Sequence, residues 1–345
     1  MIDGVIRWSL QNRLIVLLAA GLLLVVGSFT AWHMPVDVFP DLTAPTVTVM
    51  TEAHGMAPEE VETQIAFPLE AAINGAPGVR RVRSVAAVGI AIVWVEFDWG
   101  TDIYQARQVV NEKLQLAEAA MPPGADRPVL APTSSIMGEI LFLALTSDRH
   151  DLMELKTTAD WVLRKRLLAV PGVSQVIPTG GETKQYQVVL QPERLAAFGV
   201  GVDEVVRALR ETNENTSAGY LLEGGQQYLI QGVGRVRRPA DIGETVVAMR
   251  GREPVLVRQL GDVRIGPAIK IGEGSHDGKP AVVIGIHKQP GANTLELTRK
   301  LDRVLDDIQA TLPQGMEIDR NTFRQADFID VSVRNVLGSL RDGAV

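Results

Sequence analysis

The sequence contains no cysteine among its 345 residues. This absence excludes disulfide bonds, cysteine zinc sites and cysteine nucleophiles together. Basic residues are fewer than acidic ones: the sequence has 34 Lys and Arg and 41 Asp and Glu, which give a formal net charge of −7. No basic face is therefore available for a nucleic-acid partner. A hydrophobic content of 46% is enough for two or three small cores and one membrane span.

Motifs of catalytic sites are missing as well. The sequence has neither a Gly-x-Ser-x-Gly nucleophile turn nor a His-Glu-x-x-His zinc motif. Residues 272–279 resemble a phosphate-binding loop, but Glu273 stands where its first glycine is required and Pro280 where its hydroxyl residue is required. The five histidines lack ligand spacing: His33, His54, His150, His276 and His287. We expect neither an enzyme nor a resident cofactor.

One long apolar run lies near the N-terminus. Leu14 to Trp32 is 19 residues without a charge, about 28 Å as a helix, which is close to the hydrocarbon thickness of a bilayer. A secretory signal peptide has a shorter apolar core and a small-residue cleavage site. Arg7 and Arg13 precede the run, and Asp37 and Asp41 follow it. The positive-inside rule then places the N-terminus in the cytoplasm and the bulk of the chain in the periplasm.

Short motifs recur along the chain at two fixed spacings. Pro77-Gly78-Val79 recurs 94 residues later, whereas Gly100-Thr101-Asp102 and Pro122-Pro123-Gly124 recur in similar form 191 residues later. The two spacings differ by 97 residues. A unit of about 85 residues is therefore present twice, and its second copy contains an insertion about one small domain long.

Apolar positions follow the same two spacings, with the period of two expected of strands and the period near 3.6 expected of helices. At a spacing of 94 the matched pairs are Val47 and Leu141, Val49 and Leu143, Val61 and Leu155, Leu69 and Leu163, and Ile73 and Leu167. At a spacing of 191 they are Ala106 and Leu297, Val110 and Leu301, Leu114 and Leu305, and Ala117 and Ile308.

Each copy reads as strand, helix, strand, strand, helix, strand. In the first copy Pro58 favours the start of one helix, Pro68 predicts a kink in it, and Asp102 is the expected N-cap of a second helix, residues 103–119. This order is that of the split βαβ, ferredoxin-like sandwich. The sequence thus predicts an α+β fold: an N-terminal transmembrane helix, then two ferredoxin-like βαββαβ subdomains, the second interrupted by an inserted α+β subdomain.

The insertion has its own periodic elements. They are a strand at residues 186–190, a helix at Asp203 to Arg210, a hairpin that turns at Glu223-Gly224-Gly225, and short strands near Val255 to Ile265.

Methionine and serine side chains form two groupings that soft cations could use. Met50, His54 and Met56 stand close together in the sequence, with His54 and Met56 predicted on one side of a loop. Ser134, Ser135 and Met137 occupy the linker between the two copies, where a cleft is expected. We take the linker residues as the candidate substrate cleft. Because neither grouping supplies three or four converging ligands, we predict no tight Cu(I), Ag(I) or Zn(II) site in this chain.

Four motifs, found in the order given below, resemble those of resistance-nodulation-division (RND) efflux permeases. Their residues are most similar to those of the heavy-metal, cation-efflux branch of that family. They are Pro35-Val36-Asp37-x-x-Pro40-Asp41-Leu42, Gly55-x-x-Pro58-Glu59-x-Val61-Glu62, Phe97-x-x-Gly100-Thr101-Asp102 and Tyr186-x-Val188-x-Leu190-x-Pro192-x-Arg194-Leu195.

The resemblance implies a division of the chain into five parts. They are a transmembrane helix (1–36), a first porter subdomain (37–131), a second porter subdomain (132–181 with 276–325), a docking subdomain (182–275) and a helix that leads to a second span (326–345).

The resemblance also implies a function and partners. RND permeases export substrates across the inner membrane with the proton gradient, form homotrimers through the docking subdomain, and act with a periplasmic adaptor and an outer-membrane channel. In this chain the corresponding hairpin, Tyr220 to Gly232, is short. The family's proton-relay carboxylates and methionine metal site lie in later segments, so the sequence resembles the N-terminal third of a cation exporter.

Two alternatives remain from the sequence. An RND exporter of drugs or other small molecules has the same architecture in this region. A single-span periplasmic binding or interaction module belongs to a different class, and a periplasmic enzyme is less favoured than either because catalytic motifs are missing.

Overall fold

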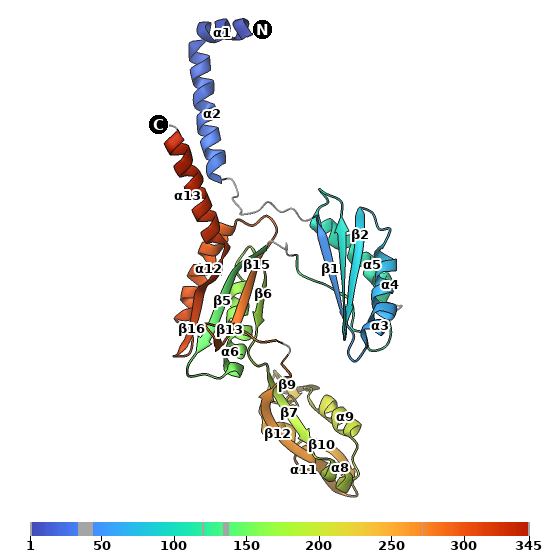
Figure 1. Ribbon diagram of the computed structural model, residues 1–345. Coiled ribbons are helices and arrows are strands. Elements are labelled where there is room, and N and C mark those ends of the chain that lie inside the picture. Colours follow the sequence, from blue (N-terminus) through green and yellow to red (C-terminus); the bar gives the residue numbers. More distant parts are fainter. Residues whose placement is uncertain (1, 34–43, 119–120, 134–137, 271, 344–345) are drawn as a thin grey trace.

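The computed structural model describes residues 2–33, 44–118, 121–133, 138–270 and 272–343 (Figure 1). It has the mixed α+β composition that the sequence predicts. Helix α1 (Ile2–Gln11) is followed by α2 (Arg13–His33), whose residues Arg13–Thr30 have a mean hydropathy of 2.2 and no buried side chain. By length and composition α2 is able to cross a membrane.

Residues 44–118 and 121–131 form a first sandwich of one sheet and one layer of helices. Its elements are β1 (Thr46–Glu52), α3 (Pro58–Val61), η1 (Glu62–Ala66), α4 (Phe67–Ile73), β2 (Val79–Ala87), β3 (Ile90–Phe97), α5 (Ile103–Glu118) and β4 (Val129–Leu130). The strand order is β2-β3-β1-β4, with all described pairings antiparallel. Helices α4 and α5 cover one face of this sheet (Figure 1).

Residues 139–179 and 282–324 form a second sandwich. Its elements are β5 (Glu139–Ser147), α6 (Leu152–Thr158), η3 (Ala159–Leu163), α7 (Arg164–Leu168), β6 (Val173–Thr179), β15 (Val282–Lys288), α12 (Thr294–Gln309) and β16 (Met316–Arg324). The strand order is β16-β5-β15-β6. Listed from the opposite edge, this order is β6-β15-β5-β16, which matches β2-β3-β1-β4 of the first sheet. Strands β5, β6, β15 and β16 thus take the places of β1, β2, β3 and β4.

Strand β15 joins two parts of the chain that the insertion separates. Ile284 lies opposite Leu143 of β5, and Gly285 lies opposite Ile177 of β6. The sequence spacings predict this pairing. The alternative, in which β15 pairs within the insertion, is not what the structure shows.

The first helical segment of each sandwich, α3-η1-α4 or α6-η3-α7, keeps one row of buried residues through a π-helical turn. Val61, Ile65, Leu69 and Ile73 are buried in the first sandwich, and Leu155, Ala159, Leu163 and Leu167 in the second. A strict spacing of four drifts about 40° per step around an α-helix. The wider turns η1 and η3 offset this drift, and η1 precedes Pro68, where we expected a kink.

Side chains cap the long helix of each sandwich, and the cap at Asp102 is the one that the sequence predicts. Asp102 Oδ1 accepts hydrogen bonds from the backbone of Tyr104 (2.9 Å) and Gln105 (3.0 Å) at the start of α5. Asn293 does the same for Glu296 at the start of α12, at 3.0 Å. These positions are 191 residues apart, so the two copies share a capping device.

The insert, residues 184–267, is a unit with its own small core of Val200, Val205, Val255 and Leu260. Its elements are β7 (Lys184–Leu190), α8 (Pro192–Phe198), α9 (Val202–Thr212), β8 (Thr216–Glu223), β9 (Gln226–Gly232), α10 (Pro239–Gly243), β10 (Val246–Arg250), β11 (Glu253–Leu256), α11 (Val257–Leu260) and β12 (Gly261–Pro267). The hairpin β8–β9 begins at Thr216, so it is longer than the sequence suggested.

The segment that leads from the second sandwich into the insert lies beside the segment that returns from it. A Cβ atom on Gly180 would lie 2.7 Å from Gly274 Cα and 2.9 Å from Ala281 O. Gly180 also has a φ of +81°, which favours glycine. The two connecting segments are therefore in backbone contact. The hairpin β13 (Ser275–His276) and β14 (Lys279–Pro280) follows, and α13 (Gln325–Gly343) ends the described chain.

Candidate functional site

The predicted cleft residues Ser134, Ser135 and Met137 lie outside the described residues. The described chain on either side of them is β4 of the first sandwich and β5 of the second. The segment that carries them therefore joins the two sheets, as the sequence predicts.

A carboxylate and an imidazole lie directly beside this linker. Glu139 is the first residue of β5 and pairs across the sheet with His287 of β15. Glu139 Oε1 is 3.5 Å from His287 Nε2, and the two side chains are 36% and 17% exposed. His287 Nδ1 is buried without a hydrogen-bond partner in the described part of the chain. This pair supplies one oxygen and one nitrogen ligand atom, and Glu139 lies two residues after Met137 in the sequence.

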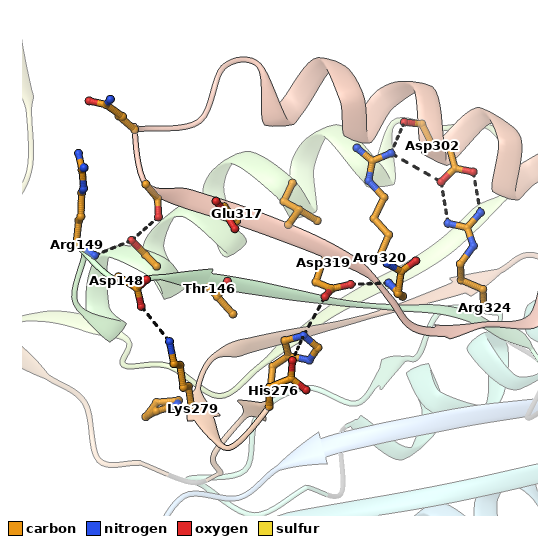
Figure 2. A pocket seen from close by; sticks show the side chains of 17 residues that line it. Thr146, Asp148, Arg149, His276, Lys279, Asp302, Glu317, Asp319, Arg320 and Arg324 are labelled. Atoms are coloured by element: carbon orange, nitrogen blue, oxygen red, sulfur yellow. Dashed lines mark hydrogen bonds and ion pairs between the residues drawn. The ribbon is translucent and has the colours of Figure 1, made fainter.

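A second feature is an open cleft of about 980 Å³ on the second sandwich (Figure 2). It lies between the turn after β5, the hairpin β13–β14 and strand β16. Its lining is strongly charged: the ionisable residues are Asp148, Arg149, His276, Asp277, Lys279, Asp302, Glu317, Asp319, Arg320 and Arg324.

Most of these charges are satisfied within the cleft. His276 Nε2 is 3.0 Å from Asp319 Oδ2, and Lys279 Nζ is 3.4 Å from Asp148 Oδ1. A backbone hydrogen bond from Asn321 lowers the pKa of Asp319, and the hydrogen bond and charge of His276 lower it further. Because these charges are paired with one another, we interpret the cleft as a network of ion pairs that holds the hairpin β13–β14 against β16.

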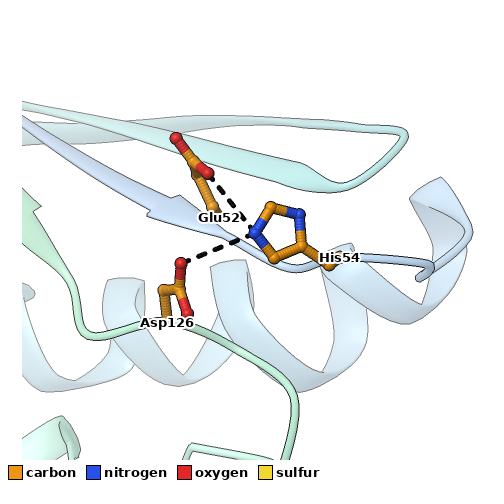
Figure 3. Close-up of side chains that lie close together, drawn as sticks. All are labelled: Glu52, His54 and Asp126. Carbon is orange, nitrogen blue, oxygen red and sulfur yellow. Dashed lines mark ion pairs between the residues drawn. The ribbon is translucent and has the colours of Figure 1, made fainter. Parts of the chain in front are cut away.

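A third feature is an exposed group at the end of β1, the acid–imidazole trio of Glu52, His54 and Asp126 (Figure 3). His54 Nε2 is 3.6 Å from Glu52 Oε2 and 3.7 Å from Asp126 Oδ2. Met56 instead packs against the core of the first sandwich. The proposed grouping of His54 with Met56 on one side of a loop is therefore wrong, because His54 faces carboxylates and Met56 faces the core.

Sequence reasoning missed Glu139, His287, Glu52 and Asp126. Glu139 and His287 had a usable signal, because the two spacings already place their strands side by side. Asp126 had none, since it lies 74 residues from Glu52 in a segment with no regular period.

Comparison with known proteins identifies the family. The sequence model of the AcrB/AcrD/AcrF family matches residues 5–345. The chain belongs to the AcrB/AcrD/AcrF family. The RND resemblance of its motifs is thereby confirmed.

Curated relatives within this family are cation exporters by name. The chain is 33% identical over 354 residues to the "Cation efflux system protein CzcA" of Alcaligenes sp. (strain CT14), covering 100% of this chain and 33% of that protein. It is also 33% identical over 344 residues to the "Cation efflux system protein CusA" of Escherichia coli (strain K12), covering 99% of this chain and 33% of that protein. The chain thus spans about one third of the length of these relatives.

A solved structure has the same fold over this region. The crystal structure of a heavy metal efflux pump, crystal form II, superposes with a TM-score of 0.88 at 30% sequence identity. The match covers 98% of this chain and 34% of that one.

Proposed function

We propose that this chain is the N-terminal porter portion of a proton-driven RND transporter that exports metal cations across the inner membrane. The observation that carries the proposal is the similarity of the whole chain, in sequence and in fold, to cation efflux proteins. The chain spans about one third of those relatives, and we place the proton pathway in the parts of such transporters that this chain does not span. An exporter of drugs is the alternative within the family, but the relatives named above favour cations.

The proposal gives each part of the structure a role. Helix α2 is the first membrane span, with Arg7 and Arg13 on the cytoplasmic side and residues from about 40 onward in the periplasm. The first sandwich is the first porter subdomain (37–131), and the second sandwich is the second (132–181 and 276–325). The insert is the docking subdomain (182–275), and α13 leads to a second span (326–345).

Hairpin β8–β9 is the proposed contact of the docking subdomain with a neighbouring copy in a homotrimer. Every residue of its two strands except the half-buried Gly219 is exposed. The strands carry large apolar side chains, among them Tyr220, Leu222 and Leu229, which are 66%, 77% and 58% exposed. A protruding apolar hairpin of this kind needs a partner surface. A periplasmic adaptor and an outer-membrane channel complete the proposed assembly.

The substrate path is proposed to pass the linker between the two sandwiches, at Ser134, Ser135 and Met137. The Glu139–His287 pair supports this position because it adds an oxygen and a nitrogen donor beside the linker. Carboxylate and imidazole ligands suit divalent transition-metal cations better than monovalent Cu(I) or Ag(I), which prefer sulfur.

Deletion of the chromosomal gene tests the proposal. We expect the deleted strain to accumulate Zn²⁺, Co²⁺, Cd²⁺ or Ni²⁺ and to grow poorly in them, with unchanged tolerance to drugs. Re-expression of the intact gene restores tolerance, and the Glu139→Gln and His287→Gln genes do so less well than a His150→Gln control. Unchanged cation accumulation together with new drug sensitivity would favour the alternative exporter.

A further inference from the structure

The trio of Glu52, His54 and Asp126 is built by three backbone contacts at the end of β1. The amide of Asp126 donates a 2.7 Å hydrogen bond to the carbonyl of Glu52, and Ala53 forms a β-bridge with Ala125. The amide of Ala53 donates to the carbonyl of Gly89 at 2.8 Å. These contacts tie the trio to the sheet rather than to a free loop.

The same contacts place two negative charges opposite each other. In the antiparallel bridge, Glu52 and Asp126 are cross-strand neighbours, and like charges in this position destabilise a sheet. The nearest arginine in the sequence, Arg127, pairs instead with Glu118, at 2.7 Å between Nε and Oε1. The charge balance of the site therefore favours a cation between the two carboxylates.

The donor geometry suits a small transition-metal ion. Three ligands held about 2.1 Å from one ion at tetrahedral angles lie about 3.4 Å apart. The observed separations from His54 Nε2 are 3.6 and 3.7 Å, and all three donor atoms lie within 4.8 Å of one another. Small side-chain rotations close the remaining difference, because all three side chains are more than 60% exposed.

We propose that Glu52, His54 and Asp126 form a binding site for one divalent transition-metal cation of the Zn²⁺ or Co²⁺ type. One imidazole nitrogen and two carboxylate oxygens exclude preference for Cu(I) or Ag(I), which select sulfur, and for Ca²⁺, which selects oxygen alone. Two carboxylates neutralise a divalent ion, and water completes the coordination. This open site differs from the closed, tight site whose absence the sequence predicts.

The exposure of the three side chains determines the affinity of the site for its cation and how fast the cation is released. A site with three exposed ligands and an open position holds its ion with micromolar rather than nanomolar affinity and releases it readily. Such a site captures a cation at the surface of the first sandwich and exchanges it. The inference rests on the proposed function only for the source of the cation, since binding itself requires no transport.

Titration of the purified full chain in detergent with Co²⁺ tests the site, with the visible absorption of bound Co²⁺ as the signal and Zn²⁺ as the competitor. We expect one equivalent to bind, Zn²⁺ but not Ca²⁺ to displace it, and His54→Gln or Asp126→Asn to weaken binding at least about tenfold. His276→Gln, which removes the imidazole of the His276–Asp319 pair, is the matched control and should leave binding unchanged.

Two results overturn the proposal: no saturable Co²⁺ binding below about 1 mM, or equal binding by the native chain and His54→Gln. The His54→Gln protein also reports on folding, because an exposed side chain should leave its circular dichroism and thermal midpoint unchanged. If the native chain binds no Co²⁺ while cells that carry its gene still export cations, only this site is refuted. If the native chain binds Co²⁺ while deletion of its gene leaves cation accumulation unchanged, only the proposed function is refuted.

Discussion

Asp302 of α12 accepts two hydrogen bonds from Arg324 at the end of β16, 2.9 Å from Nη1 and 2.8 Å from Nη2. This bidentate pair and its charge raise the pKa of Arg324 above its usual range, so the guanidinium stays charged. The pair fixes α12 against the last strand of the second sandwich, one residue before α13 begins.

Asp302→Asn should destabilise the second sandwich by about 1–2 kcal/mol, because Arg324 is only 18% exposed and loses its bidentate carboxylate, keeping Asp327 at 3.5 Å as its remaining ion pair. Asp306→Asn is the matched control: Asp306 is 71% exposed and pairs with Arg320 at 2.8 Å, so its loss should cost less than about 0.5 kcal/mol. Urea unfolding measures both. Equal losses in the two proteins would contradict a special role for the half-buried Asp302–Arg324 pair.

The first sandwich should lose stability in acid through Glu96. Burial alone raises the pKa of this carboxyl, but hydrogen bonds and charges of Arg81 and Arg83 together outweigh burial and lower its pKa. A carboxyl with a lower pKa in the folded than in the unfolded state stabilises the fold above the unfolded value. That contribution disappears as the pH falls below about 4.3 and passes the folded pKa.

Glu96→Gln should therefore be less stable than the native chain at pH 7 and show a flatter decline between about pH 5 and 3. Thermal unfolding across this range is the measurement. Glu112→Gln, an exposed change on α5, should keep the native pH profile; identical profiles for Glu96→Gln and the native chain would refute the assignment.

Two glycines with the same φ of +81°, Gly75 and Gly180, should respond differently to alanine. Gly75→Ala meets open space and should cost about 1 kcal/mol from backbone strain alone. Gly180→Ala places its Cβ 2.7 Å from Gly274 Cα, so it should cost several kcal/mol more or shift the connecting segments. Calorimetry of both proteins measures their thermal unfolding midpoints. Similar midpoints would show that the backbone near Gly274 moves away at little cost in free energy.

Soft monovalent cations should bind weakly to this chain. Its thioethers are dispersed, with Met50 on β1 and Met56 against the core, and thioethers alone need convergence for high affinity. Equilibrium dialysis of the full chain against competing chelators should show no nanomolar Ag(I), Cu(I) or Zn(II) site. Nanomolar binding that Met137→Ala or Met56→Ala abolishes would place soft-metal chemistry in this chain.

The orientation of α2 is open to a direct test. Protease added to spheroplasts should digest the chain after Asp41, because the positive-inside rule places that region in the periplasm. The same protease should leave a cytoplasmic marker protein intact. Protection of the region after Asp41 would reverse the proposed topology.

Sequence spacing predicted the features of this fold that depend on regular packing. The buried rows at Val61 and Leu155 and the caps at Asp102 and Asn293 repeat because each copy solves the same packing problem with the same period. The π-helical turns were not predicted, although the strict spacing of four in the buried row contains the signal. Met56 was misplaced because a thioether suits a core and a surface equally well.

The sites were less predictable than the fold. Ser134, Ser135 and Met137 lie in a linker whose role depends on how two sandwiches face each other, which local periodicity does not encode. The trio of Glu52, His54 and Asp126 depends on an irregular segment that returns to the end of β1. Contacts between residues far apart in an aperiodic stretch leave no pattern in the sequence.

The pairing of β7 with β12 has a consequence for the order of folding. The sheet of the second sandwich cannot close until β15 reaches β6, across about 100 residues of intervening chain. In the insert, Lys184 lies opposite Pro267, so an insert that folds first brings the ends of this long segment together. The effective loop shrinks to about 18 residues, which lowers the entropic cost of closure by about 1.5 kcal/mol. The peripheral unit thereby assists the assembly of the sandwich that it interrupts.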